Sequence, residues 1–325
     1  MIPPPHAPAF LAANGWGGAE IRPLAGDASF RRYFRVLAPG RTAVLMDAPP
    51  AHEDVGPFLH VAQHLIARGF SAPRALAEDR AGGLLLLDDF GDRLVGPLLR
   101  DEPALEEGIY RDAVALLVEL AKIAETSGFA PYDRAVLRRE VALFPDWYAP
   151  ALALDVDRDG FKKAWDAVLG AVDSPAAPVL VLRDYHADNI MLLDRPGLRR
   201  LGLLDFQDAL AGHPAYDLVS LLQDARRDVA PALEAAMLDH YARLAGGIDR
   251  AAYEILGAQR NTKILGIFTR LWKRDGKASY LPMQPRVWGY LERNLAHPAL
   301  APVAEWYARN VAAEFRAAAW EPLPA

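Results

Sequence analysis

The chain has 325 residues and not one cysteine. Disulfides, thiolate zinc sites and cysteine nucleophiles are therefore excluded. Long apolar runs are missing as well: stretches such as 84–87 and 179–182 have the length of strands, far short of the ~20 residues of a membrane-spanning helix. The Pro-rich start has no basic stretch followed by an apolar one, so no secretory signal is visible. We expect a cytoplasmic protein that does not bind membranes.

Positive charge is also in short supply. The chain has 36 Lys and Arg against 42 Asp and Glu, which gives a net charge of −6. Because proteins that bind nucleic acid normally present a basic face, we expect no nucleic-acid partner. Apolar material is ample, since 52% hydrophobic and 24% charged residues are typical of a globular protein. The length suggests about two domains, and we expect a monomer that acts on small molecules.

Strand-like and helical patterns divide the chain into two regions. In residues 1–90, short runs separated by turn residues predict five strands, at 19–24, 29–37, 42–47, 73–77 and 83–87. Helical spacing predicts one helix in this region, over 54–68. Beyond it, helical patterns dominate, at 102–125, 134–154, 158–172 and, with breaks, from 216 to 320. Three apolar strand-like runs interrupt them, at 178–182, 190–193 and 201–204.

The sequence thus predicts an α+β protein with two lobes. The N-lobe, residues 1–90, would be small and β-rich, with a five-stranded sheet and one helix. The C-lobe, residues 91–325, would be larger and mainly helical, and would hold the second group of strands. Clefts between two lobes are common ligand sites.

Polar residues at the ends of the central strands carry the strongest functional signal. Asp184 is followed five positions later by Asn189, and Asp205 ends the next strand but one. In kinases an Asp accepts the proton of the attacking hydroxyl, while an Asn and a second Asp hold the metal that bridges the phosphates. Asp and Asn also cap turns between buried strands. Three such residues at this spacing favour phosphoryl transfer, with Asp184 catalytic and Asn189 and Asp205 as ligands of Mg²⁺.

The same segments resemble the aminoglycoside phosphotransferase and choline kinase superfamily. The resemblance rests on Asp-x-x-x-x-Asn at 184–189, Leu-Asp-Phe-Gln-Asp at 204–208 and Gly-His-Pro-Ala-Tyr-Asp-Leu at 212–218. Within that superfamily the chain looks most like the bacterial sugar kinases that phosphorylate N-acetylmuramate and N-acetylglucosamine at the anomeric hydroxyl. The segments 26–33, 45–50 and 264–268 carry this closer resemblance.

The resemblance implies a two-lobe protein-kinase-like fold, ATP as co-substrate, Mg²⁺ as cofactor and a role in recycling cell-wall amino sugars. The residues expected to lie over the phosphates are Gly26, Asp27 and Ser29. The segment 86–91 would be the hinge, with Asp88 and Phe90 at the adenine.

The sequence departs from the family pattern at two places. Leu182 and Arg183 stand where many relatives have His-Gly before the catalytic Asp. The third strand of a kinase N-lobe normally supplies a Lys to the phosphates, but Met46 occupies that place. Either the chain is a pseudokinase that binds nucleotide without transferring phosphate, or another cation substitutes. The candidates are Arg31, Arg32 and Arg35, for which a solvated strand edge is the alternative.

A basic segment is the main signal for the acceptor. Residues 255–290 contain seven cations and a single acid. Helical spacing places four of them on one face: Lys263, Arg270, Arg274 and Lys277. Such a run is usually a solvated helix face, but a cationic wall would suit the lactyl carboxylate of N-acetylmuramate and would repel a polycationic aminoglycoside. The residues expected to contact the sugar are Arg183, Asp208 and Arg270.

Three other functions stay open at this point. The chain could be a kinase of an aminoglycoside or a choline-like acceptor, or the pseudokinase already named. It could also be a metal-dependent hydrolase, with a site built from His186, Asp188, Asp205 and His213. We further expect Asp217 to cap a helix and to brace the catalytic loop.

Overall fold

The computed structural model describes residues 1–26, 30–123 and 125–316. The chain forms two compact units. Unit 1 comprises Met1–Pro103 and Asp188–Asp208, and unit 2 comprises Ala104–Ala187 and Ala209–Ala325. The expected boundary lay at residue 90, whereas here the first unit extends to Pro103 and also takes in the segment 188–208.

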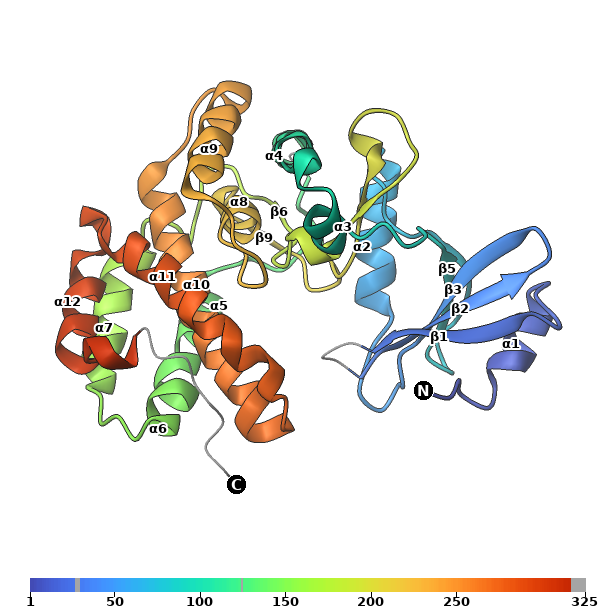
Figure 1. The fold of residues 1–325 in the computed structure, drawn as a ribbon, viewed down its shortest axis with the longest axis horizontal. Helices are drawn as coiled ribbons and strands as arrows, with labels where there is room; N and C mark the ends of the chain where they lie inside the picture. Colours follow the sequence, from blue (N-terminus) through green and yellow to red (C-terminus); the bar gives the residue numbers. More distant parts are fainter. Residues whose placement is uncertain (27–29, 124, 317–325) are drawn as a thin grey trace. The chain divides into compact units, whose positions relative to one another are not determined.

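Unit 1 is built on a five-stranded antiparallel sheet in the order β1-β2-β3-β5-β4 (Figure 1). Its strands are β1 (Glu20–Gly26), β2 (Arg32–Ala38), β3 (Arg41–Asp47), β4 (Ala75–Asp79) and β5 (Leu84–Asp88). All five expected strands are therefore confirmed. A turn at Gly40, with φ of +74°, joins β2 to β3 and fixes their register, in which Tyr33 lies opposite Met46.

The two faces of this sheet have different partners because side chains alternate along a strand. One face buries Phe34, Leu45 and Leu86 against α1 (Ala7–Ala13), a helix that the sequence analysis missed. The other face presents Tyr33 and Val44 to a pocket that α2 also lines.

Unit 1 has further elements, some of which line this pocket. They are α2 (Gly56–Ala67), α3 (Val95–Asp101), the 3₁₀ turns η3 (Ala187–Asn189, at the boundary) and η4 (Gly197–Arg200), and the antiparallel pair β7 (Ile190–Leu192) and β8 (Leu201–Leu203). A bridge between Leu94 and Met191 and the contact of α3 with β7 attach the segment 188–208 to the hinge region. This is why that segment belongs to unit 1.

Unit 2 is mainly helical, as expected. Its helices are α4 (Glu106–Ala121), α5 (Arg134–Val141), α6 (Ala149–Ala151), α7 (Arg158–Leu169), α8 (Ala215–Leu222), α9 (Pro231–Ala245), α10 (Arg250–Asp275), α11 (Gln284–Leu295) and α12 (Ala301–Asn310). Shorter helical turns are η1 (Pro103–Leu105, at the boundary), η5 (Ala278–Met283), η6 (Pro298–Leu300) and η7 (Ala313–Phe315). Two short strands, β6 (Val179–Val181) and β9 (Leu210–Gly212), pair antiparallel.

The helical pattern expected over 134–154 is confirmed, but it is not one regular α-helix. The chain there forms α5, then the π-helical turn η2 (Phe144–Tyr148), then α6. Pro145 and Pro150 stand at the first turns of the second and third pieces. Because proline lacks the N–H that a continuous helix needs, the run divides at these positions.

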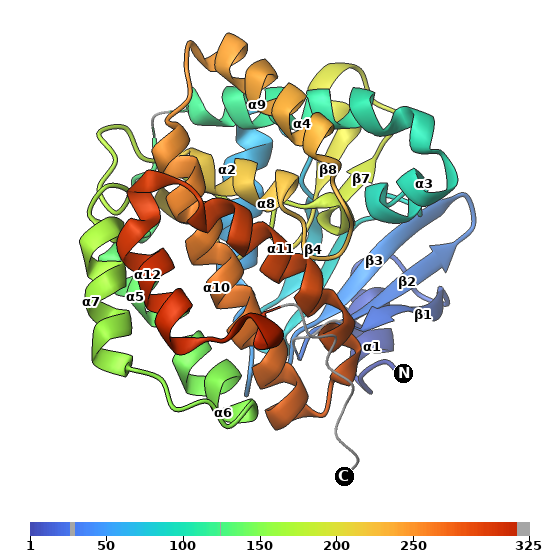
Figure 2. The ribbon, with the colours of Figure 1, turned by 60° about the vertical axis from the view of Figure 1, so that its left-hand side comes forward.

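Helix α10 is the central element of unit 2 and contacts α5, α8 and α11 (Figure 2). Seventeen of its 26 residues are buried, so it is buried on nearly every side. Gly266 allows the closest approach, since a Cβ there would lie 2.4 Å from the backbone carbon of Leu143. Among the described residues, no helix combines the length and apolar character that crossing a bilayer requires.

Candidate active site

A pocket of about 440 Å³ lies within unit 1. The sheet contributes Leu24, Tyr33, Val44 and Leu87, and α2 contributes Phe58. The rest of the lining comes from the hinge segment 88–92 and from the segment that carries Asn189 and Asp205. An apolar floor with a few polar groups at one side is typical of sites for small ligands, and the volume fits one.

Asn189 and Asp205 lie next to each other at this pocket. The Asn189 amide nitrogen is 3.4 Å from Asp205 Oδ2, and Gln207 Nε2 donates to Asp205 Oδ1 at 2.8 Å. Asp205 follows β8 with a φ of +54°, a conformation that non-glycine residues rarely adopt and that occurs often at functional sites. The Asp205 carboxylate and the Asn189 side-chain amide are oxygen ligands of the kind that suit Mg²⁺, which takes its remaining ligands from phosphates and water.

The segment predicted to be the hinge contributes to the pocket. Asp88 and Phe90 both line it, and the Arg195 guanidinium lies 5.1 Å from the centre of the Phe90 ring. Glycine at position 202 leaves room for this ring, because a Cβ there would come within 2.7 Å of Phe90 Cδ2. Arg35 lies at the same end of the sheet, where it contacts Asp89 and Asp92.

The opposite end of the sheet holds the other expected nucleotide residues. Gly26 ends β1 opposite Arg32, whereas Asp27 and Ser29 lie outside the described residues. Arg32 pairs with Asp47, and Arg31 is buried, with Nε 3.4 Å from Glu53 Oε2. Met46 is confirmed as the residue at the usual lysine position of the third strand.

In unit 2, Asp184 lies among cations. Its carboxylate is 44% exposed and stands 3.9 Å from the guanidinium of Arg260, which is itself buried. Desolvation opposes ionisation of Asp184, but the charges of Lys263 and Arg260 outweigh it and hold its pKa below the usual value. The preceding Arg183 has a φ of +72°, so the backbone turns sharply just before Asp184.

Glu140 of α5 organises these cations. It is buried, with Oε1 2.6 Å from the Arg183 guanidinium and 2.9 Å from Lys263 Nζ. Gln259 donates to its other oxygen at 3.0 Å. Burial alone would raise the pKa of Glu140, but Lys263 and Arg183 lower it to about 2. This buried carboxylate therefore holds one cation of α10 and the residue next to Asp184.

Asp217 braces the same loop. Its two oxygens accept hydrogen bonds from the backbone N–H groups of Leu182 and Arg183, at 2.6 and 2.8 Å. Burial raises its pKa to about 7, and the two N–H donors act in the opposite direction. The expected bracing is confirmed, but Asp217 lies inside the first turn of α8 and does not cap it.

The two histidines of the hydrolase hypothesis are engaged elsewhere. His186 is buried and its Nε2 accepts from Arg226 at 2.9 Å, while burial, followed by the charge of Arg226, lowers its pKa well below the usual value. His213 Nδ1 accepts from the backbone N–H of Ala215 at 3.1 Å. Within the described residues, no group of three His, Cys, Asp or Glu side chains could hold a metal ion. These contacts disfavour a histidine metal site.

The basic segment does not form the continuous helical face that its spacing predicted. Lys263 and Arg260 are buried, and Lys277 lies beyond the end of α10. Arg274 pairs with Asp275 at 2.7 Å. Most of these charges are thus neutralised inside the unit or by a neighbour.

The three residues expected to contact the sugar differ in setting. Arg183 forms an ion pair with Glu140. Asp208 is exposed and is the last residue of unit 1. Arg270 is half-buried in α10, and burial lowers its pKa. It lies two turns from Lys263 on the same side of the helix, ~10 Å along the axis.

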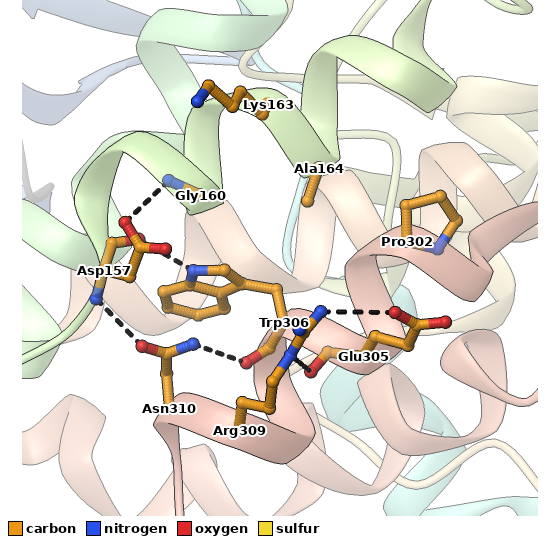
Figure 3. Close-up of a pocket in the computed structure, with 9 residues that line it drawn as sticks. All are labelled: Asp157, Gly160, Lys163, Ala164, Pro302, Glu305, Trp306, Arg309 and Asn310. Carbon is orange, nitrogen blue, oxygen red and sulfur yellow. Dashed lines mark hydrogen bonds and ion pairs between the residues drawn. The ribbon is translucent and has the colours of Figure 1, made fainter.

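A second pocket, of about 500 Å³, lies between α7 and α12 of unit 2 (Figure 3). Trp306 Nε1 donates to the carbonyl of Asp157 at 2.7 Å, and the backbone N–H of Asp157 donates to Asn310 at 2.8 Å. Arg309 pairs with Glu305. These polar groups form hydrogen bonds and an ion pair with one another, and the bonds of Asp157 connect the start of α7 to α12.

Neither Glu140 nor the burial of Arg260 and Lys263 was predicted from the sequence. Their partners are 43 to 123 positions away in the chain, which no local pattern reports. The lining residues Tyr33 and Val44 carried only a weak signal, which was strand alternation, and Phe58 carried only the helical spacing of α2.

Comparisons with known proteins agree with this arrangement. The pattern of the Phosphotransferase enzyme family matches residues 20–256. An N-acetylmuramate/N-acetylglucosamine kinase of Caulobacter vibrioides is 36% identical, over 95% of this chain and 96% of that protein. A protein of the same name from Pseudomonas aeruginosa is 39% identical, over 92% and 91% of the two chains.

Solved structures with low sequence identity share the fold. Aminoglycoside 2′-phosphotransferase-IIIa in its GDP complex has a TM-score of 0.60 at 15% identity, covering 90% of this chain and 98% of its own. A choline kinase of Streptococcus pneumoniae has a TM-score of 0.58 at 12% identity, with coverages of 87% and 93%. The expected kinase-like fold is thereby confirmed. The family pattern over residues 20–256 and the relatives at 36% and 39% identity show that the chain belongs to the phosphotransferase enzyme family.

Proposed function

We propose that the protein is an ATP- and Mg²⁺-dependent amino sugar kinase that phosphorylates the anomeric hydroxyl of N-acetylmuramate and N-acetylglucosamine. The observation that carries this proposal is the similarity, over more than nine-tenths of both chains, to kinases named for these two sugars. Its role would be the recycling of cell-wall amino sugars. Because ATP is its phosphate donor, we place it in the cytoplasm, and we propose that it acts as a monomer.

The pocket of unit 1 would hold the nucleotide. Adenine would lie between the apolar sheet face and the hinge residues Asp88 and Phe90. The phosphates would extend toward Asn189 and Asp205, the proposed Mg²⁺ ligands. A bound Mg²⁺ would neutralise charge on the phosphates and orient them for transfer.

Asp184 would orient the sugar hydroxyl and accept its proton. Since nearby cations hold its pKa below the usual value, it is ionised at neutral pH and is a weak base. Phosphoryl transfer has a loose transition state with little need for an early proton transfer, so a well-placed, ionised carboxylate suffices. Glu140 and Asp217 would act through Asp184 by holding its loop and the neighbouring cations.

On the acceptor side, we keep Arg183, Asp208 and Arg270 as proposed contacts, and Arg270 is the one we propose for the lactyl carboxylate. Replacing it by Gln should raise KM for N-acetylmuramate at least about tenfold and leave KM for N-acetylglucosamine within about threefold, because only the first sugar carries the carboxylate. Equal effects on the two sugars would contradict this assignment.

The direct test is a panel of ATP-consumption assays with N-acetylmuramate, N-acetylglucosamine, choline, homoserine and kanamycin. We expect turnover with the two amino sugars, and Asp184→Asn should abolish it while nucleotide binding persists. Turnover with kanamycin or choline alone would favour the functions of the structural neighbours. Nucleotide binding without turnover of any acceptor would favour the pseudokinase, which Met46 motivates.

A further inference from the structure

The lysine that kinases use at the phosphates is replaced here by a buried Met46. In the register of the sheet, Met46 lies opposite Tyr33 on β2 and opposite Leu85 on β5. It shares the face of Val44, two residues earlier, which lines the pocket. The usual lysine position therefore faces the pocket side of the sheet and carries no charge.

Three arginines come from the neighbouring strand, and their places in the sheet separate them. Arg35 lies opposite Val44, in the row nearest the hinge, and binds Asp89 and Asp92 there. Arg32 alternates with Tyr33, so it leaves the strand on the face of the α1 core, where it binds Asp47. Neither lies on the pocket face at the end away from the hinge.

Arg31 has the remaining position. It precedes β2 by one residue and continues the alternation of Tyr33 and Arg35, one row beyond Met46 and ~13 Å from the hinge row. Its guanidinium is buried and lies 3.4 Å from Glu53, in the segment that leads into α2. Neither residue of this ion pair lines the pocket, but Phe58, five residues after Glu53, does, and so does Tyr33, two residues after Arg31.

Glu53 contacts two neighbouring residues before β2, Arg31 and Phe30. Its Oε2 contacts Arg31, and its Oε1 accepts from the backbone N–H of the adjacent Phe30 at 3.3 Å. The Phe30 ring also stacks on His52, with centroids 4.4 Å apart. The start of β2 is thereby tied to the segment before α2, and the cation is held by a carboxylate partner.

We infer that Arg31, held by Glu53, supplies the positive charge at the nucleotide phosphates that Met46 cannot supply. A guanidinium binds phosphate oxygens through a planar fork of N–H donors and stays charged at any physiological pH. The inference rests on the proposed function, because it requires that unit 1 bind ATP.

Binding measured on the full chain tests it, with Mg·ADP and adenosine as probes. Arg31→Met should weaken Mg·ADP binding roughly tenfold to a hundredfold, the loss expected for a charged hydrogen-bonded contact, and leave adenosine binding unchanged. Arg31→Lys should lose less. Arg80→Met is the matched control, since Arg80 forms an exposed pair with Glu78 in the same unit.

A double variant sharpens the test. Adding Met46→Lys to Arg31→Met returns a cation to the usual position and should recover most of the lost Mg·ADP affinity. The inference would be overturned if Arg31→Met bound Mg·ADP with unchanged affinity, or lost as much affinity for adenosine as for Mg·ADP. It would also be overturned if the double variant recovered no Mg·ADP affinity, or if Arg32→Met, instead of Arg31→Met, lost affinity for Mg·ADP alone. If the unaltered protein binds neither Mg·ADP nor adenosine, the proposed function itself fails. If the unaltered protein binds both probes and phosphorylates sugar, and Arg31→Met binds both probes equally well, only the role of Arg31 is refuted.

Discussion

Replacing Glu140 by Gln should destabilise unit 2 strongly. The substitution keeps the shape of the side chain and removes its charge. Lys263 and Arg183, which Glu140 holds at 2.9 and 2.6 Å, would then be left as buried or half-buried cations without this partner. Breaking a buried ion pair from one side typically costs about 3–5 kcal/mol.

The pKa of Glu140 gives an independent magnitude. It falls from 4.5 to about 2 on folding, a shift of about 2.5 units (4.5 − 2), and at 1.36 kcal/mol per unit this is about 3.4 kcal/mol. Because the folded value is the lower one, this stability is fully present above pH 4.5 and is lost as the pH falls toward 2. The contribution should therefore be about 3.4 kcal/mol at pH 7 and about 1.4 kcal/mol at pH 3.

Urea unfolding followed by tryptophan fluorescence measures this, since Trp165 and Trp288 are buried in unit 2. Glu140→Gln should lower the free energy of unfolding by about 3 kcal/mol at pH 7, and the difference should narrow by more than half at pH 3. Glu107→Gln, which breaks an exposed pair with Arg111, is the control and should cost less than about 0.5 kcal/mol. A midpoint equal to that of the unaltered protein at pH 7, or a deficit undiminished at pH 3, would refute the reasoning.

Three further substitutions probe close contacts. Gly96→Ala would place a Cβ 1.8 Å from Asp188 Oδ1, so it should displace the residue next to Asn189 and lower kcat at least about tenfold in a coupled ADP-release assay. Gly266→Ala should lower the free energy of unfolding by about 1–3 kcal/mol, because α10 cannot move away from Leu143 without loss of packing. Gly108→Ala, with open space around it, is the control and should not lower it. Calorimetry would detect the difference, and equal melting temperatures of the two variants would contradict the prediction. Asp217→Asn turns an amide donor toward a backbone N–H and should cost about 1–3 kcal/mol, which urea titration would detect; an unchanged midpoint would argue against the brace.

Much of unit 1 could be predicted from local patterns. The strands of the sheet alternate between core and pocket residues and are separated by turn residues, so their positions followed from the sequence. Helix α1 was missed because its segment is Pro-rich, which usually indicates a loop. Asn189 and Asp205 could be placed because both flank short apolar strands: Asn189 directly precedes β7, and Asp205 comes two residues after β8.

The helical unit was predicted less well because its pattern is ambiguous. Helix α10 is buried on nearly every side, so its cations, Arg260 and Lys263, belong to its interior contacts. Read locally, they suggested part of a basic surface for a substrate. Their partners, Asp184 and Glu140, lie in distant parts of the chain, and only the three-dimensional structure brings them together.

The boundary between the two units falls between Ala187 and Asp188, inside the Asp184–Asn189 segment. The proposed base belongs to the unit of α10, and the proposed metal ligands belong to the unit of the pocket that Asp88 and Phe90 line. Under the proposed function, substitutions in unit 2 would change the acceptor while the proposed ligands of the metal, in unit 1, stay as they are. Such a division permits one fold to serve different acceptors during evolution. The similar proteins include a choline kinase, an aminoglycoside phosphotransferase and amino sugar kinases.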